Sequence, residues 1–212
     1  MRLKHVKNAD LIMKMGKYYI DDAGNYKGRW LEVFGNSNPI YIEIGTGKGD
    51  YLIQMAILNP SINFIGIEKY DSVLVRAIQK SNELEINNLR FIRMDASNIC
   101  DVFDKEVDLI YLNFSDPWPK ERHAKRRLTS MVFLDKYQYI FKGDAHIIMK
   151  TDNINLFNYS LESLKEFGYN ILFSTNDLHN SHLANDNVCT EYERRFVQQG
   201  VKINYLDAVM KR

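Results

Sequence analysis

Short apolar runs alternate with amphipathic stretches along this chain from Pro39 to the C-terminus. Strands buried on both faces read as continuous apolar runs, and parallel strands need long, usually helical, crossovers between them. The alternation therefore predicts an α/β fold, with a mostly parallel sheet and helices on both of its faces. No repeat, low-complexity tract or linker-like composition interrupts it. We expect a single domain over residues 1–212, in which residues 1–38 form a basic lead-in.

The apolar runs define seven predicted strands, at Ile40–Ile44, Asn63–Ile67, Leu89–Met94, Val107–Phe114, Ala145–Lys150, Tyr169–Ser174 and Val201–Met210. Helices are expected between them, near Asp50–Leu58, Ser72–Glu85, Ser130–Phe141, Asn153–Phe167 and Glu191–Gln199. Asn59-Pro60 ends the first of these helices, and Thr190-x-x-Glu193 has the spacing of a capping box at the start of the last.

Charge and hydropathy exclude several classes of protein. Lys and Arg number 28 against 27 Asp and Glu, a net charge of +1 that excludes a histone-like, uniformly basic binder. No apolar run approaches the ~18 residues that a membrane span needs, and lysines interrupt the N-terminal stretch where a signal peptide would be apolar. We expect a cytoplasmic protein without a membrane partner.

The two cysteines, Cys100 and Cys189, form no C-x-x-C pair and lie near no histidine cluster in the sequence. Neither a disulfide framework nor a zinc site is indicated, so we expect packing cysteines and no metal ligands. The sequence leaves both a monomer and a homodimer open.

Acidic residues lie at or just after the carboxyl ends of five successive predicted strands: Glu43, Glu68, Asp95, Asp116 and Asp152. A single acid at such a place is explained by helix capping or by the helix dipole. In a parallel sheet, however, ligands bind outside the carboxyl ends of the strands, near the point where the strand order reverses. Five acids at one edge therefore indicate a binding site.

Glycines at Gly45, Gly47 and Gly49 follow the first strand, where a missing Cβ lets the backbone approach a ligand. The dinucleotide fingerprint G-x-G-x-x-G would require glycine where this chain has Asp50, and an acid there would repel a pyrophosphate. A ligand with an amino-acid end has no such conflict, which favours S-adenosylmethionine over NAD. Glu68 suits the ribose hydroxyls of either cofactor.

Five stretches of this chain together resemble the bacterial tRNA (guanine-N7)-methyltransferases, the TrmB type of class I S-adenosylmethionine-dependent methyltransferases. They are IEIGTGKG at 42–49, GIEK at 66–69, LNFSDPWPK at 112–120, KTDN at 150–153 and TEYERRF at 190–196. The resemblance implies a Rossmann-like, seven-stranded fold and S-adenosylmethionine as methyl donor, with S-adenosylhomocysteine as product. It also implies a tRNA partner, methylated at N7 of guanine 46 in the variable loop to give 7-methylguanosine.

Residue roles follow from the same resemblance. The implied cofactor residues are Glu43, Gly45, Gly47, Gly49, Glu68, Asp95 and Asp116, with Asp116 also facing the base. The implied substrate contacts include Lys120, Asp152, Thr190, Tyr192 and Glu193. A purely structural role for Thr190 and Glu193, as the capping box of their helix, is compatible with this, because nucleotide groups dock at helix N-termini.

The Asp116-Pro117-Trp118-Pro119 loop holds two of the four prolines in the chain, which predicts a rigid loop suited to positioning a substrate. A structural turn is the alternative for the loop as a whole. For Trp118, packing and stacking on an RNA base are both open.

Two segments concentrate positive charge. Residues 120–127, called here the basic segment, carry five basic residues against one acid, and we expect their side chains to bind phosphates: Lys120, Arg122, Lys125, Arg126 and Arg127. Residues 1–29 hold seven basic residues against three acids and provide a weaker second candidate for RNA contact.

Guanine N7 has an in-plane lone pair and no proton, so its methylation needs no general base. Catalysis then depends on alignment and on stabilising the positive charge that develops on the purine. We hypothesise that Asp116 is the catalytic residue, accepting hydrogen bonds from the N1–H and N2–H₂ edge of the guanine.

Two other functions fit parts of the pattern. A methyltransferase acting on an exocyclic amine is one, because NFSDPW resembles the N-P-P-Y type of loop, although the order of the residues differs. A catalytically silent RNA-binding module with the same fold is the other. The intact acids and glycines of the site argue against it, because such a module has no use for cofactor residues.

Overall fold

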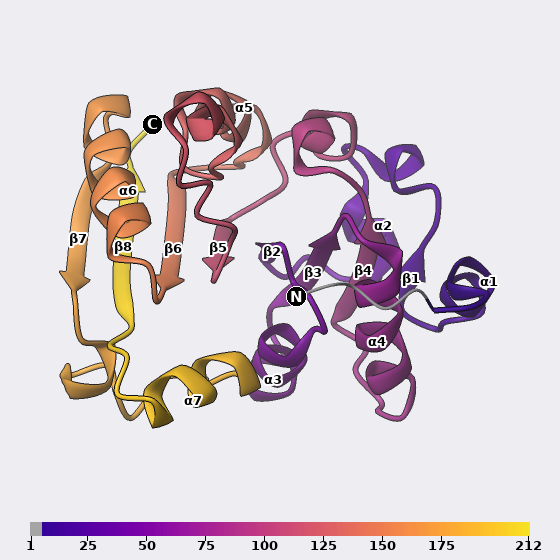
Figure 1. The fold of residues 1–212 in the computed structure, drawn as a ribbon. Coiled ribbons are helices and arrows are strands. Elements are labelled where there is room, and N and C mark those ends of the chain that lie inside the picture. Colours follow the sequence, from indigo (N-terminus) through magenta and orange to yellow (C-terminus); the bar gives the residue numbers. More distant parts are fainter. Residues whose placement is uncertain (1–5) are drawn as a thin grey trace.

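The computed structural model describes residues 6–212, and one sheet of eight strands runs through them. The strands are β1 (Tyr19–Ile20), β2 (Ile40–Ile44), β3 (Asn63–Glu68), β4 (Leu89–Arg93), β5 (Leu109–Asn113), β6 (Ala145–Thr151), β7 (Asn170–Thr175) and β8 (Asn204–Met210). Their spatial order is β1-β4-β3-β2-β5-β6-β8-β7 (Figure 1). Every pairing is parallel except those of β8, which is antiparallel to both β6 and β7. The predicted mostly parallel sheet is confirmed.

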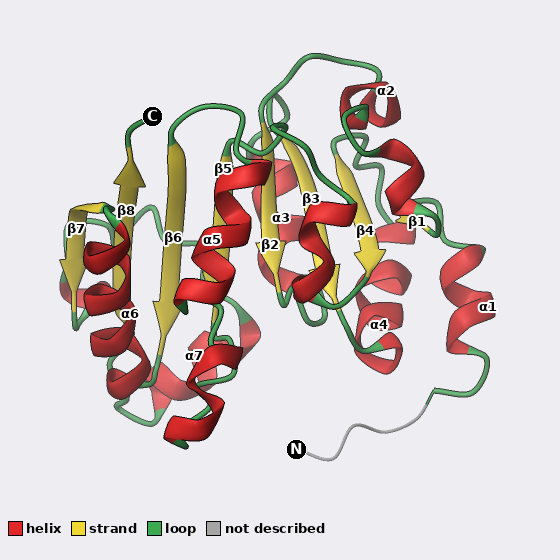
Figure 2. Ribbon diagram, turned by 90° about the horizontal axis from the view of Figure 1, so that it is seen from above, coloured by secondary structure: helices red, strands yellow, loops and turns green. Residues whose placement is uncertain are grey.

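Helices cover both faces of the sheet: α1 (Ala9–Lys14), α2 (Trp30–Phe34), α3 (Asp50–Leu58), α4 (Asp71–Asn82), α5 (Met131–Ile140), α6 (Ile154–Phe167) and α7 (Glu191–Gln198). Four 3-10 segments lie in the connections: η1 (Ala23–Tyr26), η2 (Ala96–Asp101), η3 (Glu121–Arg126) and η4 (Leu178–Asn180). One core cluster packs α2, α5 and α6 on one face, and a second packs α1, α3 and α4 on the other. Figure 2 shows α5 and α6 in front of the strands and α3 behind them. No helix in this part of the chain is both long and apolar enough to cross a bilayer.

The predicted number of seven strands is wrong by one. All seven predicted strands are present, and the eighth is β1, which lies inside the lead-in and pairs with β4 through Tyr19–Phe91 and Ile20–Ile92. A strand of two residues is too short to produce a periodic pattern in the sequence, so nothing in the composition of the lead-in distinguishes it from a loop.

The rest of the lead-in is also built into the fold. Trp30 is fully buried, its indole N–H donates to the carbonyl of Val102 at 2.9 Å, and its ring stacks on Phe103. The Glu106 carboxylate accepts hydrogen bonds from the backbone N–H groups of Gly28 and Trp30. Residues 6–38 therefore form one edge of the molecule, while residues 1–5 of the expected RNA contact lie outside the described residues.

The strand order reverses between β2 and β5. From β2 the chain moves outward through β3 to β4, and from β5 it moves the other way to β6. The carboxyl ends of β2 and β5 therefore lie side by side, and their following loops diverge to opposite faces of the sheet. A crevice at this place is the usual binding position in open α/β sheets.

Candidate active site

A cavity of about 790 Å³ lies at the reversal point, at the carboxyl ends of the central strands. Four predicted cofactor residues line it: Gly45, Glu68, Asp95 and Asp116. Apolar side chains complete the wall, among them Ile67, Met94 and Phe133. A cavity that combines apolar side chains with a few convergent carboxylates suits a nucleoside whose ribose and ammonium groups need acceptors. The residues present therefore fit S-adenosylmethionine.

Glu68 and Asp95 are held in place by the backbone around them. Glu68 accepts hydrogen bonds from the N–H groups of Gly47, Lys69 and Tyr70, which fixes its carboxylate at the start of α4. Asp95 accepts from the backbone N–H of Ser97 and lies 2.6 Å from Lys69 Nζ. The hydrogen bonds from Lys69 and Ser97 lower the pKa of Asp95 to about 2, so this carboxylate is ionised at neutral pH.

The three glycines of the first loop have different roles, although all three have positive φ angles. A Cβ added at Gly45 would meet no atom within 4 Å, so this backbone borders open space at the cavity. A Cβ at Gly49 would lie 2.8 Å from the Cβ of Ala77, so Gly49 is glycine for close packing of α3 against α4. Gly47 donates its N–H to Glu68. Of the three, Gly45 alone lines the cavity.

Glu43 lies beneath the cavity and does not line it. Its carboxylate is buried and accepts hydrogen bonds from Thr46 Oγ1 at 2.7 Å and Asn113 Nδ2 at 2.8 Å. Burial raises the pKa of Glu43 to about 7, against the smaller opposing effects of these two donors and of Lys150. Glu43 thus connects the glycine loop after β2 to the end of β5.

Replacing Glu43 by Gln should change how stability depends on pH. The folded carboxyl keeps its proton up to about pH 7, whereas in the unfolded chain it loses the proton near 4.5. Charging the buried group therefore lowers the free energy of unfolding as the pH rises from 4.5 to 7. We expect Glu43→Gln to be up to about 3 kcal/mol more stable than wild type at pH 8 and less than about 1 kcal/mol more stable at pH 5. Urea denaturation without cofactor checks this, and parallel pH curves would contradict it.

The loop after β5 is held in an unusual conformation. Phe114 and Trp118 have positive φ angles of 51° and 41°, which residues with a Cβ adopt only when the surroundings enforce it. Arg127 supplies that constraint, because its guanidinium donates to the carbonyls of Pro117 and Trp118. Asp116 is exposed between them and faces the cavity. The rigid loop predicted from the two prolines is braced by this arginine as well.

The basic segment forms η3 and has two sides. Lys125 and Arg126 line the cavity, and the Arg126 guanidinium lies 4.8 Å from the centre of the Trp118 ring. Lys120 and Arg122 are exposed. Arg127, predicted with them as a phosphate contact, is buried and bonds within the protein. In this structure its charge holds the loop and does not face solvent.

The Trp118 ring is neither fully packed into the protein nor fully open for stacking on a base. Its ring is half-buried, with Arg126 over one face and His123 edge-on at 5.7 Å. The indole therefore packs against the protein's own basic segment at the mouth of the cavity.

Two of the predicted substrate contacts, Asp152 after β6 and Tyr192 in the first turn of α7, lie close together. The Tyr192 ring packs against Phe114 at 5.0 Å and stacks on Phe196 at 4.6 Å. Partial burial raises the pKa of Tyr192, and the carboxylates of Asp152 and Asp116 raise it further. The fold therefore brings residues from three separate motifs together beside the loop after β5.

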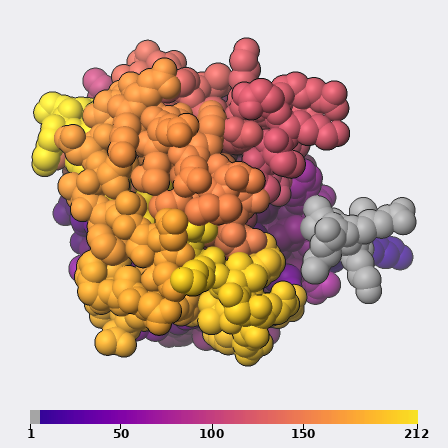
Figure 3. Space-filling view, turned by 60° about the vertical axis from the view of Figure 1, so that its left-hand side comes forward, coloured from indigo at the N-terminus to yellow at the C-terminus, as the bar shows by residue number. Residues whose placement is uncertain are grey.

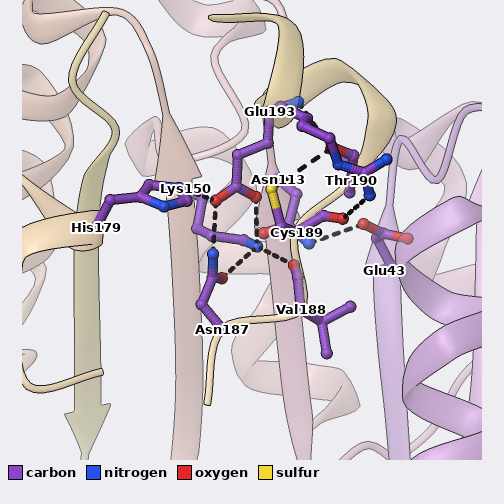
Figure 4. Close-up of polar contacts among 10 residues, drawn as sticks. Glu43, Asn113, Lys150, His179, Asn187, Val188, Cys189, Thr190 and Glu193 are labelled. Carbon is purple, nitrogen blue, oxygen red and sulfur yellow. Dashed lines mark hydrogen bonds and ion pairs between the residues drawn. The ribbon is translucent and has the colours of Figure 1, made fainter. Parts of the chain in front are cut away.

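One of the two hydrogen bonds of the predicted capping box is present. Thr190 Oγ1 accepts a hydrogen bond from the Glu193 N–H at 3.0 Å, as expected of an N-cap. The reciprocal bond is replaced by another, because the Glu193 carboxylate turns inward to the Lys150 ammonium at 3.0 Å (Figure 4). Glu193 is 0% exposed, so in this structure it does not reach the surface as a substrate contact would.

Sequence reasoning overlooked the residues around Glu193. Lys150, His179, Asn187 and Cys189 converge on it, and the ligand atoms of His179, Cys189 and Glu193 lie within 4.8 Å of one another. The sequence shows no histidine cluster near Cys189, but folding brings one histidine, His179, beside it. A signal was present in the sequence: Lys150 is a charged residue directly after the apolar run Ile147–Met149, where it needs a buried partner.

Solved structures define the class of this fold. The chain is similar to the 16S rRNA methyltransferase KamB, with a TM-score of 0.66 and 12% identity over 87% of this chain and 94% of that one. It is also similar to a SAM-dependent methyltransferase from Aquifex aeolicus, with a TM-score of 0.56 and 15% identity over 98% and 100% of the two chains. The fold is that of the class I S-adenosylmethionine-dependent methyltransferases, as predicted.

Sequence relatives are more specific. The tRNA (guanine-N(7)-)-methyltransferase of Lachnoclostridium phytofermentans is 50% identical over 209 residues, 98% of each chain. The enzyme of that name from Bacillus subtilis strain 168 is 47% identical over 205 residues, 96% of each chain. A family model described as "Putative methyltransferase" matches residues 37–206. The chain belongs to the tRNA (guanine-N7)-methyltransferase family, which confirms the resemblance seen in its motifs.

Proposed function

We propose that this chain transfers a methyl group from S-adenosylmethionine to N7 of guanine 46 in the variable loop of tRNA. The observation that carries the proposal is the position of Asp116, which a braced loop holds at the reversal point beside the cavity. Family membership supports the reaction, and the carboxylates and open glycine backbone of the cavity support the donor. A tRNA substrate is consistent with a cytoplasmic location.

S-adenosylmethionine, when bound, supplies an electrophilic methyl group. Glu68 would accept hydrogen bonds from its ribose hydroxyl groups and Asp95 would lie beside its adenine, while the backbone at Gly45 leaves room for it. Asp116 accepts from the N1–H and N2–H₂ edge of the guanine, which orients N7 and favours the cationic purine that methylation produces. No residue has to remove a proton, because N7 carries none.

Labelled S-adenosylmethionine and unmodified tRNA test the proposal, with the methylated nucleosides identified after digestion. We expect 7-methylguanosine. A base methylated on an exocyclic amine would support the first alternative function, and tRNA binding without transfer would support the silent RNA-binding module. Either of these results would contradict the proposal.

The basic segment should make tRNA binding depend on salt. Lys120 and Arg122 are exposed next to the loop after β5, called here the catalytic loop because it carries Asp116. Each phosphate contact releases condensed counterions from the RNA. We expect Lys120→Gln/Arg122→Gln to reduce the slope of log K against log salt concentration by about 1.5 to 2. Fluorescence titration at several salt concentrations measures the slope. Lys142→Gln, an exposed lysine before β6 at the opposite edge of the sheet, is the matched control, and equal slopes in all three proteins would contradict the prediction.

A further inference from the structure

A buried ion pair joins α7 to the sheet. Lys150 Nζ, at the end of β6, lies 3.0 Å from Glu193 Oε2, and the two side chains are 2% and 0% exposed (Figure 4). Removing two charges from water is costly, and apolar side chains of similar volume are often as stable or more stable in such a place. Stability alone therefore gives no reason for a charge pair here.

Both charges have all the partners they need within the protein. The Lys150 ammonium donates to Asn187 Oδ1 at 3.0 Å, to the carbonyl of Val188 at 2.9 Å and to Glu193. The Glu193 carboxylate also contacts Asn187 Nδ2 at 2.7 Å and His179 Nε2 at 2.8 Å. Since this carboxylate is saturated and inaccessible, a direct contact with guanine would require it to leave the cluster.

Lys150 and Glu193 are each close in sequence to a predicted substrate contact. Asp152 comes two residues after Lys150, and Tyr192 directly precedes Glu193. α7 itself lies at the molecular surface, where it forms the yellow group of atoms in the lower part of Figure 3. The cluster therefore connects this surface helix to the interior of the sheet.

We propose that Lys150 and Glu193 are positioning residues, which tie α7 to the end of β6 and thereby hold Tyr192 against Asp152 and the catalytic loop. The inference rests on the proposed function. It gives Glu193 an indirect role in place of the substrate contact that its motif implies.

A metal site is the competing explanation for the same cluster. His179, Cys189 and Glu193 could each supply one ligand atom. A divalent cation there would have to displace the Lys150 ammonium from the carboxylate that both need. The ammonium thus occupies the cationic position of the cluster, and the test below includes zinc.

The double variant Lys150→Met/Glu193→Leu tests the proposal, because it removes both charges and leaves neither one buried alone. We expect a folded protein whose kcat/KM for tRNA falls about 10- to 100-fold, since displacing a substrate-positioning group by 1 Å has effects of this size. The Kd for S-adenosylmethionine should change by less than about twofold, because the cofactor residues are untouched. Hydrogen exchange should accelerate in residues 187–196 and nowhere else.

His146→Gln is the matched control, since it breaks another side-chain contact of β6, the 2.8 Å hydrogen bond with Asp207, far from α7. It should leave tRNA kinetics and exchange in residues 187–196 unchanged. If the double variant does not fold, Glu193→Gln is measured in the same way, with the same expectations.

Three results would overturn the proposal. The first is a folded variant with wild-type kcat/KM for tRNA. The second is a raised KM for tRNA with unchanged exchange in residues 187–196, which would indicate direct contact by Glu193. The third is thermal stabilisation by Zn²⁺ in the wild type that Cys189→Ser abolishes. A wild type that binds S-adenosylmethionine but transfers no methyl to tRNA would instead overturn the proposed function. Hydrogen exchange in the variants would still test whether Lys150 and Glu193 hold α7 against β6.

Discussion

Asp116→Asn is expected to lower kcat about 100- to 1000-fold while leaving S-adenosylmethionine binding nearly intact. The carboxylate is exposed at the cavity, in a loop whose backbone Arg127 holds through Pro117 and Trp118. The amide keeps the shape of the side chain but loses the negative charge that balances the purine cation. Its NH₂ group is also a hydrogen-bond donor, so it cannot accept from the N–H groups of the guanine when it faces them.

Single-turnover methylation with saturating tRNA and cofactor, together with calorimetric titration of S-adenosylmethionine, measures both quantities. Asp104→Asn is the matched control, because Asp104 is an exposed aspartate that precedes the amino end of β5, whereas Asp116 follows its carboxyl end. Near-normal turnover in Asp116→Asn would remove Asp116 from the catalytic role. Loss of cofactor binding with unchanged single-turnover chemistry would give it a binding role only.

Lys150→Met is expected to destabilise the protein by about 3–5 kcal/mol, because it leaves the Glu193 carboxylate buried without a cation. The ammonium also satisfies Asn187 and the carbonyl of Val188, so two further acceptors lose their donor. Burial lowers the pKa of Lys150, and the adjacent Glu193 charge opposes that effect. The pair therefore depends on both charges being present.

Urea denaturation at pH 7 measures the change in the free energy of unfolding. Lys150→Met/Glu193→Leu should recover most of the loss, because no charge is then left alone in the interior. Lys202→Gln, which breaks the exposed ion pair with Asp177, is the control and should change stability by less than about 1 kcal/mol. If Lys150→Met were as stable as this control, the buried pair would have no part in holding α7.

The sheet and the edge that carries the site could be predicted from the sequence, because both depend on local patterns. Continuous apolar runs identify seven of the strands, and acids after successive strands identify the carboxyl edge. β1 could not be predicted, because a strand of two residues is too short to show an alternating pattern. The packing role of Gly49 could not be predicted, because it depends on contact with the Cβ of Ala77 on α4, a residue distant in the sequence.

Charged residues show most clearly what a pattern leaves undetermined. Arg127 and Glu193 belong to a basic run and a capping box, and both patterns place them at the surface. Each is buried because of a distant group: Arg127 packs over the ring of Tyr159 and bonds the catalytic loop, and Glu193 meets Lys150. Spacing along a chain shows which residues can share a helix turn, but not which element lies opposite.

The central claim is that the methyl group goes to N7 of one guanine, and two tRNA transcripts that differ at a single ring atom test it most directly. One carries guanine at position 46, and the other carries 7-deazaguanine there, which keeps the N1–H and N2–H₂ edge but has no N7. With labelled S-adenosylmethionine, we expect one methyl group per guanine transcript and none on the 7-deazaguanine transcript. Equal labelling of both transcripts would place the methyl group elsewhere and contradict the account.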